Sequence, residues 1–172
     1  MNNKGFTLTE LTVTLALLGI MSAISIPSYF SWLPRHRLQT SVRHIYDDMN
    51  MARSMAVKNN TAAVAIFDIS SDTYTVFLDT SSPLNWTPDA GEIIVTNGTL
   101  ENGVDIYGST DSTNKYGFNT RGLRISENSP PVAFPDYQVY LTNSSGLLMG
   151  VHVTIAGGLK IISSTDGGTN WS

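Results

Sequence analysis

The sequence predicts an α+β protein in which one long N-terminal helix packs on a domain of antiparallel β-sheets. Three observations support this fold class. An apolar stretch runs from residue 6 to residue 26, a stripe of apolar residues with helical spacing runs from 38 to 56, and short alternating segments follow from residue 61. The chain therefore divides into an extended helical part and one compact domain.

The apolar stretch is long enough to cross a membrane. Its 21 residues, 6–26, carry one charge and reach about 32 Å as a helix, roughly the thickness of a bilayer's hydrocarbon core. A secretory signal peptide is the alternative, because Ala23-Ile24-Ser25 has a small-x-small pattern that a signal peptidase would cut. Signal peptides have shorter apolar regions and no carboxylate near their start. We therefore expect a retained transmembrane helix over residues 6–27.

The single charge in this stretch, Glu10, needs a physical explanation. An acidic side chain at the centre of a membrane helix costs about 2.5–3.5 kcal/mol, and less near the headgroups. No Lys or Arg lies between Phe6 and Pro34. Either Glu10 stays near the headgroups, or its partner comes from another chain, for which a free α-amino group would serve.

The residues around Glu10 resemble the type III signal of type IV pilins and type II secretion pseudopilins. They read Lys4-Gly5-Phe6-Thr7-Leu8-Thr9-Glu10-Leu11. The resemblance implies that residues 1–5 are a leader peptide, which a prepilin peptidase removes by cutting between Gly5 and Phe6. It also implies N-methylation of Phe6, pairing of Glu10 with the Phe6 amine of a neighbouring subunit during assembly, and a helix bend at Pro27.

The flanks of the apolar stretch carry aromatic and basic residues. Three rings, those of Tyr29, Phe30 and Trp32, follow it at the level expected of a membrane interface. Basic residues near the stretch are Lys4 on one side and Arg35, Arg37 and Arg43 on the other. The positive-inside rule alone would favour the opposite orientation. The orientation with the N-terminus in the cytoplasm is therefore implied by the resemblance.

Residues 28–60 predict an amphipathic helix. Apolar residues recur in steps of four and three along one face, namely at Leu38, Val42, Ile45, Met49, Ala52 and Ala56. Pro34 predicts a break or a kink near Leu33, because its ring removes a backbone donor and clashes with the preceding turn. Asn59-Asn60, preceded by Lys58, predicts the end of the helix.

Residues 61–172 predict a β-rich globular head. Eight candidate strands are separated by turns rich in Ser, Asp, Asn and Gly, and lie at 62–69, 74–79, 92–96, 104–107, 116–119, 137–142, 148–155 and 159–163. Several short strands after one long helix predict antiparallel sheets.

Two internal segments are similar to the GspH/FimT group of minor pilins and pseudopilins. They are the helix end at 51–60 and the strand-then-glycine element at 116–122, and the closing hairpin through Gly157-Gly158 also fits. The resemblance implies a pilin-like fold, with a long N-terminal helix packed on antiparallel sheets. It further implies a minor pilin or pseudopilin, a structural subunit of a type IV pilus or a type II secretion pseudopilus, assembled through its N-terminal helix and placed near the filament tip.

The same resemblance implies partners and a location. The partners are other pilins or pseudopilins in a hetero-oligomeric filament, the prepilin peptidase and the inner-membrane assembly platform. The location is the inner membrane, crossed once with the head in the periplasm, and afterwards a periplasmic or surface filament.

Catalytic and cofactor-binding patterns are missing from the sequence. His36 and His44 are eight residues apart, not at the four-residue spacing that places two metal ligands in adjacent turns. Nucleophile-elbow and phosphate-loop motifs do not occur, and there is no cysteine. Asp68, Asp72 and Asp79 offer oxygen ligands for calcium, but they lack EF-hand spacing, and such loop carboxylates are usually solvated. We expect no enzymatic activity, no cofactor and no metal.

The alternative function is that of a DNA-binding minor pilin of a competence pilus. It would need clustered Lys and Arg on the head. After residue 60 there are four basic residues, Lys115, Arg121, Arg124 and Lys160, against eleven acidic ones, a net charge of −7. Such a head repels phosphate on average, so nucleic acid is not an expected partner.

Overall fold

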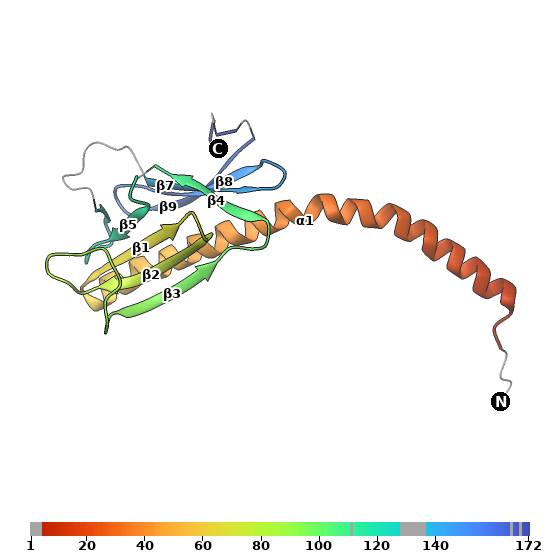
Figure 1. Cartoon of the computed structure of the whole chain (residues 1–172), viewed down its shortest axis with the longest axis horizontal. Helices are drawn as coiled ribbons and strands as arrows, with labels where there is room; N and C mark the ends of the chain where they lie inside the picture. Colours follow the sequence, from red (N-terminus) through yellow and green to blue (C-terminus); the bar gives the residue numbers. More distant parts are fainter. Residues whose placement is uncertain (1–4, 111, 128–136, 166, 169) are drawn as a thin grey trace.

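The structure is a computed structural model, and it describes residues 5–110, 112–127, 137–165, 167–168 and 170–172. It contains one long helix, α1 (Leu8–Asn59), followed by a β-rich head (Figure 1). The strands are β1 (Ala62–Asp68), β2 (Thr73–Asp79), β3 (Ile93–Thr99), β4 (Val104–Ser109), β5 (Lys115–Phe118), β6 (Arg124–Ser126), β7 (Tyr137–Asn143), β8 (Leu148–Val153) and β9 (Leu159–Ser164).

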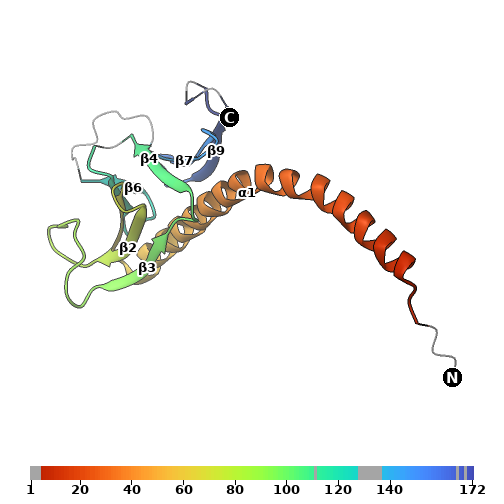
Figure 2. The same ribbon diagram turned by 45° about the vertical axis from the view of Figure 1, so that its right-hand side comes forward.

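The strands form two antiparallel sheets, and α1 packs against both of them. One sheet has the order β3-β2-β1-β5-β6 and the other the order β4-β7-β8-β9. The second half of α1 lies along the sheets, while its first half projects away from the head (Figures 1 and 2). The predicted fold class is therefore confirmed. The short strand β6 was not predicted, because three residues are too few to show an alternating pattern.

The two halves of α1 have opposite surroundings. All residues from 5 to 32 are exposed. The predicted apolar stripe from Leu38 to Ala56, by contrast, is at most 1% exposed and forms the spine of the core. The helix contains a segment that is long and apolar enough to cross a membrane, and none of that segment is buried against the head. One helix thus supplies both the projecting apolar rod and the central element of the head.

The helix is continuous through Pro27 and Pro34. Of the two outcomes expected near Leu33, the structure excludes the break. Each proline removes one intrahelical hydrogen bond, and the bonds on either side hold the helix together, so proline bends a long helix more readily than it ends it. Figures 1 and 2 show α1 as an arc that curves away from the head.

The main core is centred on stacked aromatic rings between the helix and the sheets. The ring of Phe67 stacks on those of Tyr74 and Tyr116, with 5.7 Å between centroids in both pairs, and the Tyr116 and Tyr137 rings are 3.9 Å apart. The Tyr74 hydroxyl donates to a carboxylate oxygen of Asp48 at 2.6 Å. The core therefore links strands of both sheets to the helix.

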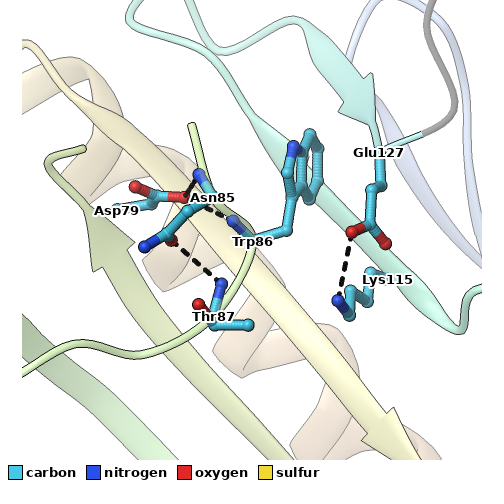
Figure 3. A network of polar contacts seen from close by, with 6 residues as sticks. All are labelled: Asp79, Asn85, Trp86, Thr87, Lys115 and Glu127. Atoms are coloured by element: carbon cyan, nitrogen blue, oxygen red, sulfur yellow. Dashed lines mark hydrogen bonds and ion pairs between the residues drawn. The ribbon is translucent and has the colours of Figure 1, made fainter. Parts of the chain in front are cut away.

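A second, smaller cluster lies outside the main core. Val64 and Phe77 pack there against Trp86, which belongs to the loop between β2 and β3. The buried carboxylate of Asp79 holds this loop in place, because it accepts hydrogen bonds from the backbone N–H groups of Ser81, Asn85 and Trp86 at 3.0–3.2 Å. Figure 3 shows the bonds from Asn85 and Trp86. The loop thus covers an apolar surface that would otherwise face water.

The three aspartates considered for calcium serve separate structural purposes. Asp68 and Asp79 lie at opposite ends of the β1–β2 pair, and Asp72 bonds to β4. Across the described part of the chain, no group of three or more potential ligands is placed to hold a metal ion. Asp79 is also not solvated, contrary to our expectation for loop carboxylates, because three backbone donors replace water around it.

Candidate assembly site on the N-terminal helix

The residues singled out by the sequence lie together at the free end of α1. Gly5 and Phe6 precede the helix in a segment without regular secondary structure, Thr7 is its N-cap, and Glu10 belongs to its first turn. Phe6 is 86% exposed. The Gly5–Phe6 bond and the side chain of Glu10 are thus open to other proteins.

The carboxylate of Glu10 and the hydroxyl of Thr7 form a capping box. Oε2 of Glu10 accepts hydrogen bonds from the backbone N–H of Thr7 at 3.0 Å and from its hydroxyl at 2.8 Å, and the backbone N–H of Glu10 donates to the Thr7 hydroxyl oxygen at 3.2 Å. Both residues thereby satisfy backbone donors that the helix start leaves without partners. The chain itself therefore gives Glu10 neutral partners. The sequence carries the signal for this cap, because Thr7-x-x-Glu10 has the spacing of a capping box.

The two oxygens of the Glu10 carboxylate differ in their surroundings. Oε2 makes the capping bonds, whereas Oε1 accepts no hydrogen bond from any residue in the described part of the chain. Glu10 also lines a shallow, open hollow on the side of the helix, together with Phe6, Thr9, Val13 and Thr14. One carboxylate oxygen thus remains available to a group that enters this hollow.

Four hydroxyls of the projecting helix bond to the backbone of the same helix. The hydroxyls of Thr12, Thr14, Ser22 and Ser25 donate to backbone carbonyls three or four residues earlier, at 2.7–3.0 Å. A hydroxyl bonded in this way presents mainly its carbon atoms to the surroundings. The helix surface beyond Glu10 is therefore compatible with lipid and with neighbouring apolar helices.

A long helix with an exposed apolar half, packed by its other half on two antiparallel sheets, is the architecture of a pilin-like subunit and is consistent with a membrane anchor. The family model of the type II transport protein GspH matches residues 41–157, and the model of the prokaryotic N-terminal methylation motif matches residues 1–26. The chain belongs to the GspH family, within the type IV pilin and pseudopilin superfamily, and is a minor pilin or pseudopilin.

Solved structures share its fold. The minor pseudopilin EpsH from the type 2 secretion system of Vibrio cholerae has 11% sequence identity and a TM-score of 0.54, and the match covers 76% of this chain and 99% of that one. The type IV minor pilin FimU of Pseudomonas aeruginosa has 12% identity and a TM-score of 0.57 in one crystal form, covering 77% and 96%. A second crystal form of FimU gives a TM-score of 0.53. No curated protein sequence matches the chain.

These comparisons bear on two of the expectations. The competence-pilus alternative receives no support from them. The family and the structural neighbours are filament subunits and not enzymes.

Proposed function

We propose that the chain is a structural, non-enzymatic subunit that leaves the membrane and enters a filament through its N-terminal helix. Oε1 of Glu10, which has no partner in the described part of the chain, supports this proposal most directly. In the filament this oxygen accepts a charge-assisted hydrogen bond from the Phe6 amine of a neighbouring subunit. The capping bonds to Oε2 hold the carboxylate in position for that contact.

Processing precedes assembly in this proposal. A prepilin peptidase cuts between Gly5 and Phe6, and the new amine of Phe6 is methylated. Supporting observations are the non-helical, exposed residues on both sides of this bond and the match of residues 1–26 to the methylation motif. Mass analysis of the mature N-terminus tests it: a methylated Phe6 start is expected, and a chain beginning at Ile26 would mean signal-peptide cleavage instead.

The domain division follows from the two halves of α1. We propose a leader (1–5), a transmembrane segment (6–27) that ends with a bend at Pro27, a stem helix (28–60) with a kink near Pro34, and a head (61–172). The head lies in the periplasm, and the segment crosses the inner membrane once. The partners are other pilins or pseudopilins, delivered by an inner-membrane assembly platform, with this subunit near the filament tip.

Replacing Glu10 with Gln tests the assembly contact without disturbing the helix start. Glutamine also completes a capping box, so the helix should begin normally, but the charge that the Phe6 amine requires is lost. We expect Glu10→Gln to insert into the membrane at the wild-type level and to be depleted at least about tenfold from sheared filaments, as measured by immunoblot of the two fractions.

Thr12→Val is the matched control. It removes a hydroxyl from the same helix that donates to the Thr9 carbonyl, and it leaves both the Thr7–Glu10 cap and the carboxylate charge intact, so incorporation should stay at the wild-type level. Wild-type incorporation of Glu10→Gln would show that the carboxylate charge is not the assembly contact.

A further inference from the structure

Basic residues follow the apolar segment on the head side, against the positive-inside tendency. Only some of them bond to the head. The Arg37 guanidinium donates to the backbone carbonyl of Asn102 at 3.0 Å, and that of Arg53 to the carbonyl of Gly122 at 3.0 Å. Arg35, in contrast, is exposed and makes no hydrogen bond or ion pair within the described ranges. Its guanidinium has five N–H donors available for another molecule.

Arg35 lies about one helical turn after Trp32, in an exposed group of aromatic rings on α1. Trp32 is 52% exposed, and its ring stacks on that of His36 with 4.4 Å between centroids and an angle of 15°. Tyr29 contacts Trp32 from the preceding turn, with 6.3 Å between centroids. Side chains on a helix point back toward its N-terminus, so Arg35 and His36 extend over the turn that carries Trp32.

The distance along the helix places this group at a membrane surface. Trp32 follows Ile26, the last residue of the apolar stretch, by six residues, or about 9 Å of helix, and the interfacial layer on each side of a bilayer is about 5–8 Å thick. A modest tilt brings the Trp32 ring into that layer, where indole rings are favoured. Arg35 and His36 then lie at the level of the phosphates.

The head is held close to the same surface. The backbone N–H of Glu101 donates to the Ser41 hydroxyl at 3.1 Å, and Arg37 binds Asn102. Only residues 33–36 separate Trp32 from Arg37, which makes the contact nearer to the apolar segment. Arg35 and His36, which are exposed between these contacts and Trp32, therefore lie where molecules of the membrane surface can reach them.

We propose that Trp32, Arg35 and His36 form a binding site for the headgroups of anionic phospholipids in the head-side leaflet. The guanidinium and the imidazole N–H donate to phosphate oxygens, and the indole ring rests at the boundary of the acyl chains. The site would hold the head against the membrane before assembly, and filament entry would require its release. The inference rests on the membrane anchoring proposed above and adds a lipid preference to it.

Fluorescence quenching in nanodiscs tests the lipid preference. The full-length chain is placed in discs that contain either brominated phosphatidylglycerol or, at the same mole fraction, brominated phosphatidylcholine. Subtracting the signal of Trp32→Phe isolates quenching of Trp32. We expect phosphatidylglycerol to be enriched around Trp32 about fivefold, the ratio that corresponds to about 1 kcal/mol for one basic side chain near an anionic surface. Added salt should reduce this enrichment.

Two variants complete the design. The double variant Arg35→Gln/His36→Gln should quench equally with both lipids, whereas Lys160→Gln, which removes an exposed cation from the head, should retain the preference. Equal quenching of the wild type by both lipids would overturn the lipid site and leave membrane anchoring intact. Quenching of Trp32 by neither lipid would overturn the anchoring as well.

Discussion

Oδ1 of Asp72 accepts a hydrogen bond from the backbone N–H of Ile106 at 2.8 Å. Asp72 lies in the turn between β1 and β2, and Ile106 lies in β4, so this bond joins the two sheets. The carbonyl of Asp72 also accepts the N–H of Leu100 at 3.3 Å. With a φ of 53°, Asp72 has a left-handed conformation that Asp and Asn adopt more readily than most residues.

Asp72→Ala should destabilise the head by about 1–3 kcal/mol, because it leaves the partly buried N–H of Ile106 without its acceptor and places alanine in a left-handed conformation. Asp72→Asn is the control, since the amide keeps an acceptor oxygen and tolerates the same backbone. Thermal unfolding of the full chain in detergent, followed by tryptophan fluorescence, measures both. Equal losses in the two variants would contradict the importance of the acceptor.

Gly157 and Gly103 both have a left-handed backbone, but only Gly157 lies close to another part of the chain. Comparing them distinguishes the effect of backbone strain on stability from the effect of a steric clash. The φ of Gly157 is 77°, and an added Cβ would lie 2.0 Å from the carbonyl oxygen of Gly122, whereas Gly103 has a φ of 80° and open space around it. Gly103→Ala should lower the free energy of unfolding by about 1–2 kcal/mol through backbone strain alone. Gly157→Ala should lower the free energy of unfolding clearly more, because the turns that contain Gly157 and Gly122 must move apart. Similar unfolding temperatures for the two variants would mean that the turns separate easily.

The lowered pKa of Asp68 predicts that the stability of the head depends on pH through the β1–β2 turn. Hydrogen bonds, chiefly from the Ser70 hydroxyl at 2.6 Å, lower the pKa of its carboxyl from 3.8 to about 2. Because the pKa is lower in the folded chain, this contribution to stability is present above about pH 4 and is lost as the pH falls toward 2.

Ser70→Ala should therefore raise the pKa of Asp68 toward its ordinary value. The chemical shift of the Asp68 carboxyl carbon, followed by NMR across this pH range, reports the change directly. Thr120→Ala, in a turn elsewhere on the head, should leave the titration unchanged. An unaltered midpoint in Ser70→Ala would assign the low pKa to other donors.

Much of the fold could be predicted because its signals are local. The stripe from Leu38 to Ala56 and the alternation in the strands depend on spacing along the chain, and both led to the observed arrangement. The contacts of Asp72 and Asp79 could not be predicted in this way. Their partners are set by how the turns lie in space, so each looked like an ordinary solvated loop residue.

At the candidate assembly site, too, the sequence pattern predicted some features, whereas others depend on the three-dimensional arrangement. The sequence indicated Gly5, Phe6 and Glu10 by their pattern, and their exposure in the structure is compatible with that prediction, whose test lies in the experiments above. The different surroundings of the two Glu10 oxygens required coordinates, because they depend on the rotamers of Thr7 and Glu10.

The continuity of α1 has a mechanical consequence. The helix that neighbouring subunits would grip between residues 8 and 32 is the same helix whose buried stripe anchors both sheets, and no loop intervenes to act as a swivel. Tension applied to the rod is therefore delivered straight into the packed core. Rotation of the projecting part of α1 likewise rotates the head with it, because the two parts are joined rigidly by one continuous helix.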